Sequence, residues 1–224
     1  MNRPVDQGMT VVTSCALRPP SDGLPDAVIE ALGAQLENPA VTKLVVLTES
    51  NLSAMRKAWP GFAAAKVILR GRQERPAFNA LVGAMNRHMG DGVGVIMNAD
   101  VNFASAEHTR RVIETARALA RDYAHVALCL TRYDRTPDGF ALTLSTRLGL
   151  PNTTSADTWV FASPAQLAPQ LFYRPGDMFC DKFFVHDLIV SGYRIFNPCL
   201  DCHTHHQDQD KDLAYYRALA HNPQ

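Results

Sequence analysis

Short apolar runs alternate with segments of helical periodicity along the first 130 or so residues. The runs are continuous rather than alternating in polarity, which is typical of parallel strands buried on both faces. They predict strands at residues 9–15, 41–47, 65–69, 93–97 and 125–131. The segments between them predict helices at 26–36, 51–59, 76–88 and 106–121. This alternation predicts an α/β fold with a mostly parallel central sheet flanked by helices, as in Rossmann-like proteins.

The alternation becomes less regular after Tyr133. A Trp-Val-Phe strand follows Asp157, a helix is predicted within 176–191, and a turn and strand occupy 192–198. There is no internal repeat and no linker. We therefore predict one domain over 1–224, with a regular half at about 9–132, a less regular half at about 133–208, and a C-terminal helix or tail at 209–224.

Composition excludes several classes of protein. The chain has 22 Lys and Arg against 22 Asp and Glu, so no net charge favours nucleic acid or an anionic membrane. No apolar run reaches the length of a transmembrane helix. The N-terminal residues do not form a secretory signal, so a cytoplasmic protein is expected, and its five cysteines should mostly be free thiols.

The most informative segment is 92–103, where the buried-strand pattern ends in Asn98-Ala99-Asp100. A carboxylate at the carboxyl end of such a strand lies where open α/β sheets bind ligands. Its oxygen atoms, with those of Asn98, suit Mg²⁺ or Mn²⁺ that also binds phosphates. An Asp that only caps the following helix is the alternative at this point.

Other polar residues are candidates for the same crevice. Arg75 comes just before the helix that precedes the Asp100 strand, and Asn86 lies on that helix, although solvation of a helix surface would also explain them. Asp157 lies beside Trp159, and a carboxylate next to an aromatic ring is a common way to hold a sugar. A turn Asp beside a core Trp is equally compatible with the sequence.

Asp177 and Asp181 lie near the start of the predicted 176–191 helix. Acidic residues are favourable there because they cap the helix and interact with its dipole, without any catalytic role. An acid at a helix start beside a substrate cleft is also a plausible general base.

The segment 199–208, C-L-D-C-H-T-H-H-Q-D, has four interpretations. Its Cys-x-x-Cys-His spelling matches haem attachment, which requires an exported protein. A zinc site could use Cys199, Cys202 and two of the histidines, although one tight cluster can hardly surround a tetrahedral ion. Alternatively, one histidine adds a ligand to the metal held by Asp100, or the segment is a solvated polar tail.

Taken together, these segments resemble the GT-A class of nucleotide-sugar-dependent glycosyltransferases. They are most similar to a bacterial branch linked to surface-polysaccharide assembly. The resemblance covers about residues 10–208 and rests on motifs in order: Thr13-Ser14-Cys15, Arg75 and Asn86, Asn98-Ala99-Asp100 with Phe103, Thr131-Arg132-Tyr133-Asp134, Ser155 to Phe161, Cys180-Asp181-Lys182, Gly192-Tyr193 with Asn197-Pro198, and His203-Thr204-His205.

The resemblance implies a nucleotide-binding half at about 9–132 and an acceptor or catalytic half at about 133–208. It also implies transfer of a sugar from a UDP- or GDP-type nucleoside-diphosphate sugar to a carbohydrate or lipid-linked hydroxyl acceptor. It implies Mn²⁺ or Mg²⁺ as cofactor and an enzyme in the cytoplasm, at most peripheral at the inner face of the membrane. A homo-oligomer or a membrane-associated partner could complete the site of so short a chain. The rival interpretation is a non-catalytic subunit that binds the nucleotide sugar.

The resemblance also implies roles for individual residues. Asp100 and Asn98 would bind the metal, with His205 or His203 as a further ligand. The family pattern usually has Asp where this chain has Asn98, which should weaken metal binding. Around the nucleotide the resemblance places Thr13, Ser14, Arg75 and Asn86. Asp181 would be the general base, with Asp157 as the second catalytic candidate. Asp157 and Trp159 would also hold the sugar or acceptor.

Overall fold

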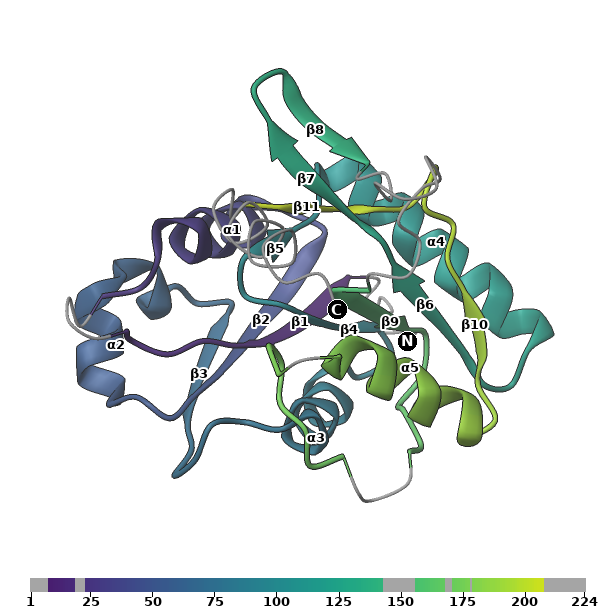
Figure 1. Ribbon diagram of the computed structural model, residues 1–224, viewed down its shortest axis with the longest axis horizontal. Coiled ribbons are helices and arrows are strands. Elements are labelled where there is room, and N and C mark those ends of the chain that lie inside the picture. The colour runs from purple at the N-terminus through teal and green to yellow at the C-terminus, as the bar shows by residue number, and fades with distance from the viewer. Residues whose placement is uncertain (1–7, 19–22, 143–155, 168–170, 178, 208–224) are drawn as a thin grey trace, which may run out of the picture.

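The computed structural model describes residues 8–18, 23–142, 156–167, 171–177 and 179–207 (Figure 1). Its central sheet has seven strands in the order β10-β6-β9-β4-β1-β2-β3. The four strands of the N-terminal half pair in parallel, as their continuous apolar runs predicted. These strands are β1 (Met9–Ser14), β2 (Val41–Thr48), β3 (Val67–Gly71) and β4 (Val93–Met97).

One strand of this sheet runs against the others. β9 (Thr158–Phe161) lies between β4 and β6 (Val126–Leu130) and is antiparallel to both. β10 (Arg194–Phe196) is parallel to β6 at the edge. Because β9 is reversed, its first residues lie beside the last residues of β4 and β6. This reversal brings Asp157, which precedes β9, to the edge of the sheet where Asn98 follows β4.

Helices cover both faces of the central sheet. Alternate side chains of β1 enter two separate cores, Val11 on one face and Val12 on the other. The Val12 face is covered by α3 (Phe78–His88) and α5 (Cys180–Val190), which lie at the front of Figure 1. The Val11 face is covered by α1 (Asp26–Glu37), α4 (Ala106–Asp122), α2 (Leu52–Ala58) and the 3₁₀ turn Pro60–Ala63.

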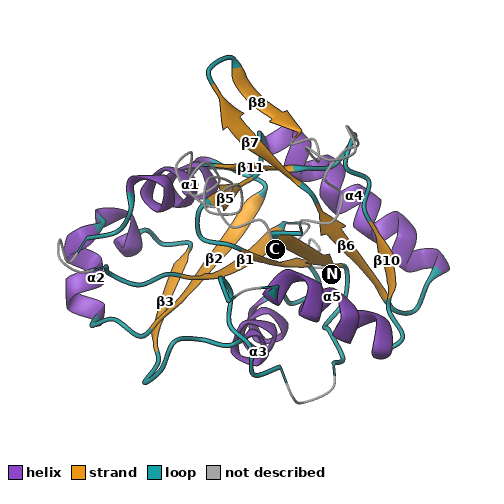
Figure 2. Cartoon of the chain, viewed as in Figure 1, coloured by secondary structure: helices purple, strands orange, loops and turns teal. Residues whose placement is uncertain are grey.

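A second sheet of four short strands was not predicted. Its order is β5-β11-β7-β8, and the β7–β8 hairpin projects at the top of Figure 2. The strands are β5 (Val101–Asn102), β7 (Arg132–Thr136), β8 (Gly139–Leu142) and β11 (Thr204–His206). β11 is antiparallel to β5 and parallel to β7, so it joins residues far apart in the sequence. The interpretation of 199–208 as a solvated polar tail is therefore wrong for the strand residues, since Thr204 and His206 are buried.

The expected mostly parallel α/β architecture is confirmed, and most predicted elements end within two residues of their observed limits. The predicted terminal helix or tail at 209–224 lies outside the described residues. No helix in the described ranges has the length and apolarity needed to cross a bilayer.

Candidate active site

A pocket of about 430 Å³ opens at the carboxyl ends of β1 and β4. The loop after β1 forms one wall, and the turn after β4 forms another. The 175–176 segment, which precedes α5, closes a third side together with Arg75. The polar lining residues are Ser14, Cys15, Arg18, Glu49, Arg75, Asn98 and Asp100. The structure thus brings Ser14, Arg75, Asn98 and Asp100 together in the lining of one pocket.

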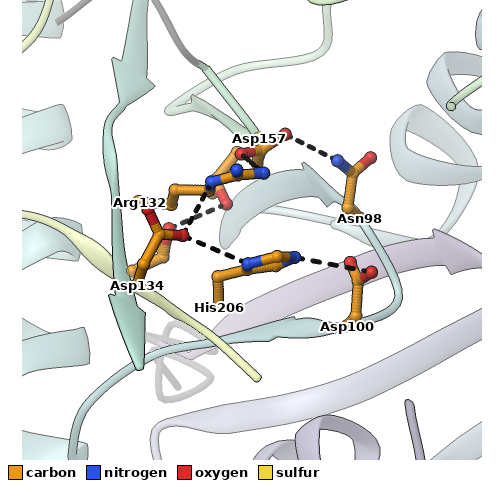
Figure 3. A network of polar contacts seen from close by, with 8 residues as sticks. Asn98, Asp100, Arg132, Asp134, Asp157 and His206 are labelled. Carbon is orange, nitrogen blue, oxygen red and sulfur yellow. Dashed lines mark hydrogen bonds and ion pairs between the residues drawn. The ribbon is translucent and has the colours of Figure 1, made fainter. Parts of the chain in front are cut away.

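Asn98 is held by the residue that precedes β9. Its side-chain Nδ2 donates a 2.7 Å hydrogen bond to Oδ1 of Asp157, and its backbone N–H donates to the Asp157 carbonyl at 3.0 Å. Because the amide nitrogen faces the carboxylate, the amide oxygen of Asn98 points away from Asp157 (Figure 3). Asp157 is 7% exposed, so its carboxylate is part of the buried support of the pocket.

Arg132 joins two carboxylates beneath the pocket. Its Nη1 lies 3.2 Å from Oδ2 of Asp157, and its Nε lies 3.0 Å from Oδ1 of Asp134. Burial raises the pKa of Asp157, and the Arg132 charge opposes that rise. The guanidinium therefore keeps a buried acid next to Asn98 without leaving it unpaired.

His206 continues the network from Asp134 to Asp100. Its Nδ1 lies 3.2 Å from Oδ1 of Asp134, and its Nε2 lies 3.6 Å from Oδ2 of Asp100. Burial would lower the pKa of this imidazole, but its interactions with Asp100 and Asp134 raise it to about 9. His206 is therefore a cation at neutral pH. Figure 3 shows the continuous chain of contacts from Asn98 through Asp157, Arg132, Asp134 and His206 to Asp100.

The two histidines predicted as metal ligands lie elsewhere. In β11, side chains alternate between the two faces of the sheet, so His206 and His205 point in opposite directions. The ring of His205 stacks on Phe140, and the ring of His203 stacks on Tyr133. Burial and neighbouring histidines lower the pKa of both to about 4. The structure therefore places His206, and not its neighbours, against Asp100.

The pocket offers two oxygen donors that fit a divalent cation. These are the Asp100 carboxylate and the amide oxygen of Asn98, which faces away from Asp157. Within the described part of the chain there is no cluster of three or more His, Cys, Asp or Glu side chains that could hold a metal. A cation here would depend on ligand oxygens such as those of a diphosphate, which is the usual arrangement for Mg²⁺.

Arg75 is fixed by the segment that precedes α5. Its guanidinium lies 3.4 Å from Oδ1 of Asp177 and donates to the carbonyl of Pro175. Gly176 has a φ of +83°, and a Cβ there would lie 2.9 Å from the guanidinium. The glycine therefore allows Arg75 to lie close against this backbone at the mouth of the pocket.

The two predicted nucleotide-binding residues of β1 differ in position. Ser14 lines the pocket, whereas Thr13 is 1% exposed and points into the protein. Cys15 also lines the pocket, and burial together with the charge of Glu49 raises the pKa of its thiol to about 12. Cys15 is consequently a neutral thiol at physiological pH.

Two predicted site residues have structural surroundings instead. The side chain of Asn86 makes reciprocal 2.8 Å hydrogen bonds with the backbone of Ala165, so it anchors the segment after β9. Trp159 is 1% exposed and lies edge-to-face with Phe78 and Phe184 in the core. These contacts leave neither residue at the pocket. The sequence did not predict this, because it does not show which face of a helix or strand each side chain occupies.

Asp181 lies in the first turn of α5 and is half-buried. Its charge is one of those that raise the pKa of Asp157. Of the cysteines in the 199–208 segment, Cys202 is buried in the core and contacts Thr115, while Cys199 is half-buried.

Three network residues were missed as functional candidates, namely Arg132, Asp134 and His206. Arg132 and Asp134 occur in one of the motifs behind the resemblance, so that motif held a usable signal. The signal for His206 was the histidine cluster itself, but the phase of β11 decides which histidine faces Asp100.

The order and direction of the strands, with a polar pocket at the carboxyl ends of β1 and β4, define a GT-A-like fold. No protein-family model and no curated protein matches the sequence. Among solved structures, the chain is similar to the mannosyltransferase PcManGT from Pyrobaculum calidifontis in complex with GDP-Man and Mn²⁺, with a TM-score of 0.56, 15% identity, and coverage of 96% of this chain and 65% of that one.

A second similar structure is S. aureus TarS 1-349, with a TM-score of 0.55, 11% identity, and coverage of 96% of this chain and 64% of that one. The chain thus spans just under two thirds of the length of both solved chains. Likeness at this identity shows the fold, and it agrees with the GT-A-like fold expected from the sequence.

Proposed function

We propose that the protein is a glycosyltransferase that moves a sugar from a nucleoside-diphosphate sugar to a hydroxyl acceptor. The observation that carries the proposal is the pocket in which Asp100 and Asn98 lie with Ser14 and Arg75. Oxygen donors and a guanidinium around one cavity suit a cation-bound diphosphate. The mannosyltransferase of similar fold, whose structure contains GDP-Man and Mn²⁺, supports the same interpretation.

In this proposal Asp100 and the amide oxygen of Asn98 would hold Mn²⁺ or Mg²⁺. When bound, the cation would offset the negative charge of the leaving nucleoside diphosphate. Arg75 would contribute a positive charge from the side formed with residues 175–176, and Ser14 would donate a hydrogen bond from the end of β1. The network through Asp157, which fixes the side chain of Asn98, would keep its oxygen directed into the pocket.

The transfer replaces the bond between the anomeric carbon and the diphosphate oxygen by a bond to the acceptor oxygen. The acceptor hydroxyl loses its proton in this step, and a carboxylate within reach can accept it. We assign this role to Asp181, which is half-buried at the start of α5. Asp157 is the weaker candidate, because Asn98 and Arg132 already occupy its two oxygen atoms.

A non-catalytic subunit that binds the nucleotide sugar is the second candidate. Two observations favour it: Asn98 stands where the family pattern has an acid, and the His206 cation already lies 3.6 Å from Asp100. Both reduce the negative charge available to a divalent cation. Such a subunit would bind the donor and neither hydrolyse nor transfer the sugar.

The test combines binding and turnover. Thermal unfolding is measured with nucleoside diphosphates in the presence and absence of Mn²⁺, since a ligand that binds the native state raises Tm by mass action. At a ligand concentration of 100 Kd the stabilisation is about 2.7 kcal/mol. Hydrolysis of nucleotide-sugar donors is then measured with the same preparations. Cation-dependent binding with slow donor hydrolysis supports the enzyme, and binding without any hydrolysis supports the subunit.

Matched variants assign the effect to the pocket. Asp100→Asn should abolish the Mn²⁺-dependent rise in Tm, because it removes the carboxylate from the proposed donor pair. Asp91→Asn changes an exposed acid before β4 and should leave the rise intact. Equal responses of both variants would show that the cation binds elsewhere.

A further inference from the structure

Two hollows lie side by side along α3 and the edge strand β3, outside the pocket that contains Asp100. One has a volume of about 370 Å³ and the other about 640 Å³. They share Gly71, Arg72, Asn79 and Ala80, so they form one continuous groove. Because β3 is the last strand of the sheet, nothing in the described sheet covers this side of the groove.

Arginines line this groove, which we call the arginine groove. Arg70 and Arg72 come from β3 and the residue after it, and Arg87 comes from the last turn of α3. All three are exposed, and no acidic side chain of the described residues pairs with them. A basic residue at a helix C-terminus is favourable for the helix and would explain Arg87 alone. It does not explain the two arginines that face it from the strand.

The positive charge of the groove affects the pKa of His88. Burial lowers the pKa of this histidine, and the nearby charges of Arg70, Arg87 and Lys43 lower it further. The chain as a whole has equal numbers of acidic and basic residues. Within the described part of this neutral chain, arginines without an acidic partner therefore gather at this groove.

The groove leads to the proposed active site. Its larger hollow is lined by Arg72, Arg174 and Arg75, and Arg75 also lines the pocket that contains Asp100. A chain bound along the groove would therefore reach Arg75 at the mouth of that pocket. Arg174 and Arg75 have acidic partners, Glu74 at 3.7 Å in the same hollow and Asp177 at 3.4 Å. Among the described residues, the positive charge without an acidic partner is therefore greatest at the distal end, around His88.

We infer that the arginine groove binds an anionic polymer chain with repeated carboxylate or phosphate groups, and that this chain is the acceptor of the proposed transfer. The role of this chain as acceptor rests on the proposed function, whereas the binding of an anionic polymer rests on the groove alone. Planar guanidinium groups bind carboxylate and phosphate oxygens in pairs, so spaced arginines match a chain of spaced anions.

The shape of the site favours a flexible chain over a membrane. The arginines surround hollows between a helix and a strand, whereas a bilayer surface contacts protruding side chains. Peripheral membrane binding also needs apolar side chains that insert beside the charges. Only Phe172 among the residues lining the two hollows is an exposed large hydrophobic residue.

The experiment compares two double variants of the full chain. Arg70→Gln with Arg87→Gln removes charge from the groove, and Arg110→Gln with Arg121→Gln removes the same charge from exposed positions on α4, on the opposite face of the sheet. Fluorescently labelled polygalacturonate and polyphosphate are the probes, with neutral dextran as control. We expect the groove variant to bind the anionic probes about tenfold more weakly, and the α4 variant within about twofold of wild type.

Donor binding separates this inference from the proposed function. Neither Arg70 nor Arg87 lines the Asp100 pocket, so Mn²⁺-dependent binding of nucleoside diphosphate should be unchanged in the groove variant. If wild type binds the polymers through the groove but binds no nucleotide, the proposed transfer is wrong and the polymer site stands. If both variants bind the polymers equally, the groove is not the site.

Two further results would overturn the inference. One is binding of neutral dextran as tight as that of the charged chains. The other is a groove-dependent retention on phosphatidylglycerol vesicles, or on duplex DNA, without binding of either soluble polymer.

Discussion

Nε2 of His206 lies 3.6 Å from Oδ2 of Asp100, the carboxylate that we propose as a cation ligand. The other ring nitrogen lies 3.2 Å from Asp134, and the side chain is 3% exposed. An imidazole with a carboxylate at each nitrogen can donate to both only in its protonated form. His206 therefore offsets part of the negative charge of Asp100 whenever no other cation is bound.

This pairing predicts a loss of stability at alkaline pH. The pKa of His206 is raised from 6.5 to about 9 in the folded protein, so the native state holds this proton more tightly than the unfolded chain. The stabilisation is complete below pH 6.5 and is lost as the pH rises through 9. It amounts to roughly 3 kcal/mol. Urea unfolding between these pH values, with a chelator present, measures it.

The His206→Gln variant should show little of this alkaline loss, because it has no titrating ring between the two carboxylates. His186→Gln, which changes an exposed histidine on α5, should behave like wild type. An alkaline loss of the same size in His206→Gln would mean that another group is responsible.

The second prediction concerns Asn98. The sequence alone suggests that Asn98→Asp would improve cation binding by adding a charge. In the structure, however, its Nδ2 donates at 2.7 Å to the buried Asp157 carboxylate. The variant would place two carboxylates in contact, so one must take up a proton or the turn must move. We expect a loss of about 1–3 kcal/mol without Mn²⁺, larger at pH 8 than at pH 5.

The pH dependence has this sign because a carboxyl beside another carboxylate has a raised pKa when folded, and its contribution to stability falls as the pH rises. Added Mn²⁺ should restore part of the loss if the cation binds at this turn. Asn98→Ala is the control, since it loses the hydrogen bond without gaining a charge. Full stability of Asn98→Asp at pH 8 without metal would refute the contact.

The third prediction concerns the ion pair between Arg132 and Asp157. Arg132→Met leaves Asp157 buried without this cation, which should destabilise the protein by about 3 kcal/mol in urea unfolding. Adding Asp157→Asn should recover part of the loss, because the unpaired charge is then removed. Arg111→Met breaks an exposed pair with Glu107 and should cost about 0.5 kcal/mol or less. Equal losses of stability in Arg132→Met and Arg111→Met would show that the buried pair stabilises the protein no more than an exposed pair does.

The strands of the central sheet were predictable because each carries a local apolar run long enough to identify it. The second sheet was not, because its strands are short and polar and pair across the whole chain. His206 and Asp134, which contact each other across this sheet, are 72 residues apart in sequence. No local pattern specifies such a pairing.

The same distinction applies to the site. The position of Asp100 could be predicted because ligands bind at the carboxyl ends of parallel strands, whereas Ser14 and Arg75 were assigned to the same site by the family resemblance. Asp157 meets Asn98 only because β9 runs antiparallel, which its Trp-Val-Phe pattern does not reveal. The choice between His205 and His206 depended on the phase of a three-residue strand, where a shift of one residue reverses every side chain.

The last prediction concerns the proposed general base. Asp181→Asn keeps the size and much of the hydrogen-bonding capacity at the first turn of α5, so stability should change by about 1 kcal/mol or less. The amide cannot accept the acceptor proton, so transfer should fall by about 10²-fold or more. Donor binding should survive, because Asp181 does not line the pocket that contains Asp100.

Asp157→Asn serves as the comparison, since that carboxylate contacts Arg132 and Asn98 and should mainly affect stability. If Asp181 serves only to favour the start of α5, the pattern is the reverse: Asp181→Asn loses some stability and transfers sugar at the wild-type rate. A stable Asp157→Asn variant that binds donor but no longer transfers sugar would instead move the base to Asp157. Single-turnover transfer rates, measured with the melting temperature and donor affinity of each variant, distinguish these outcomes, because a general base affects the chemical step and leaves binding and folding intact.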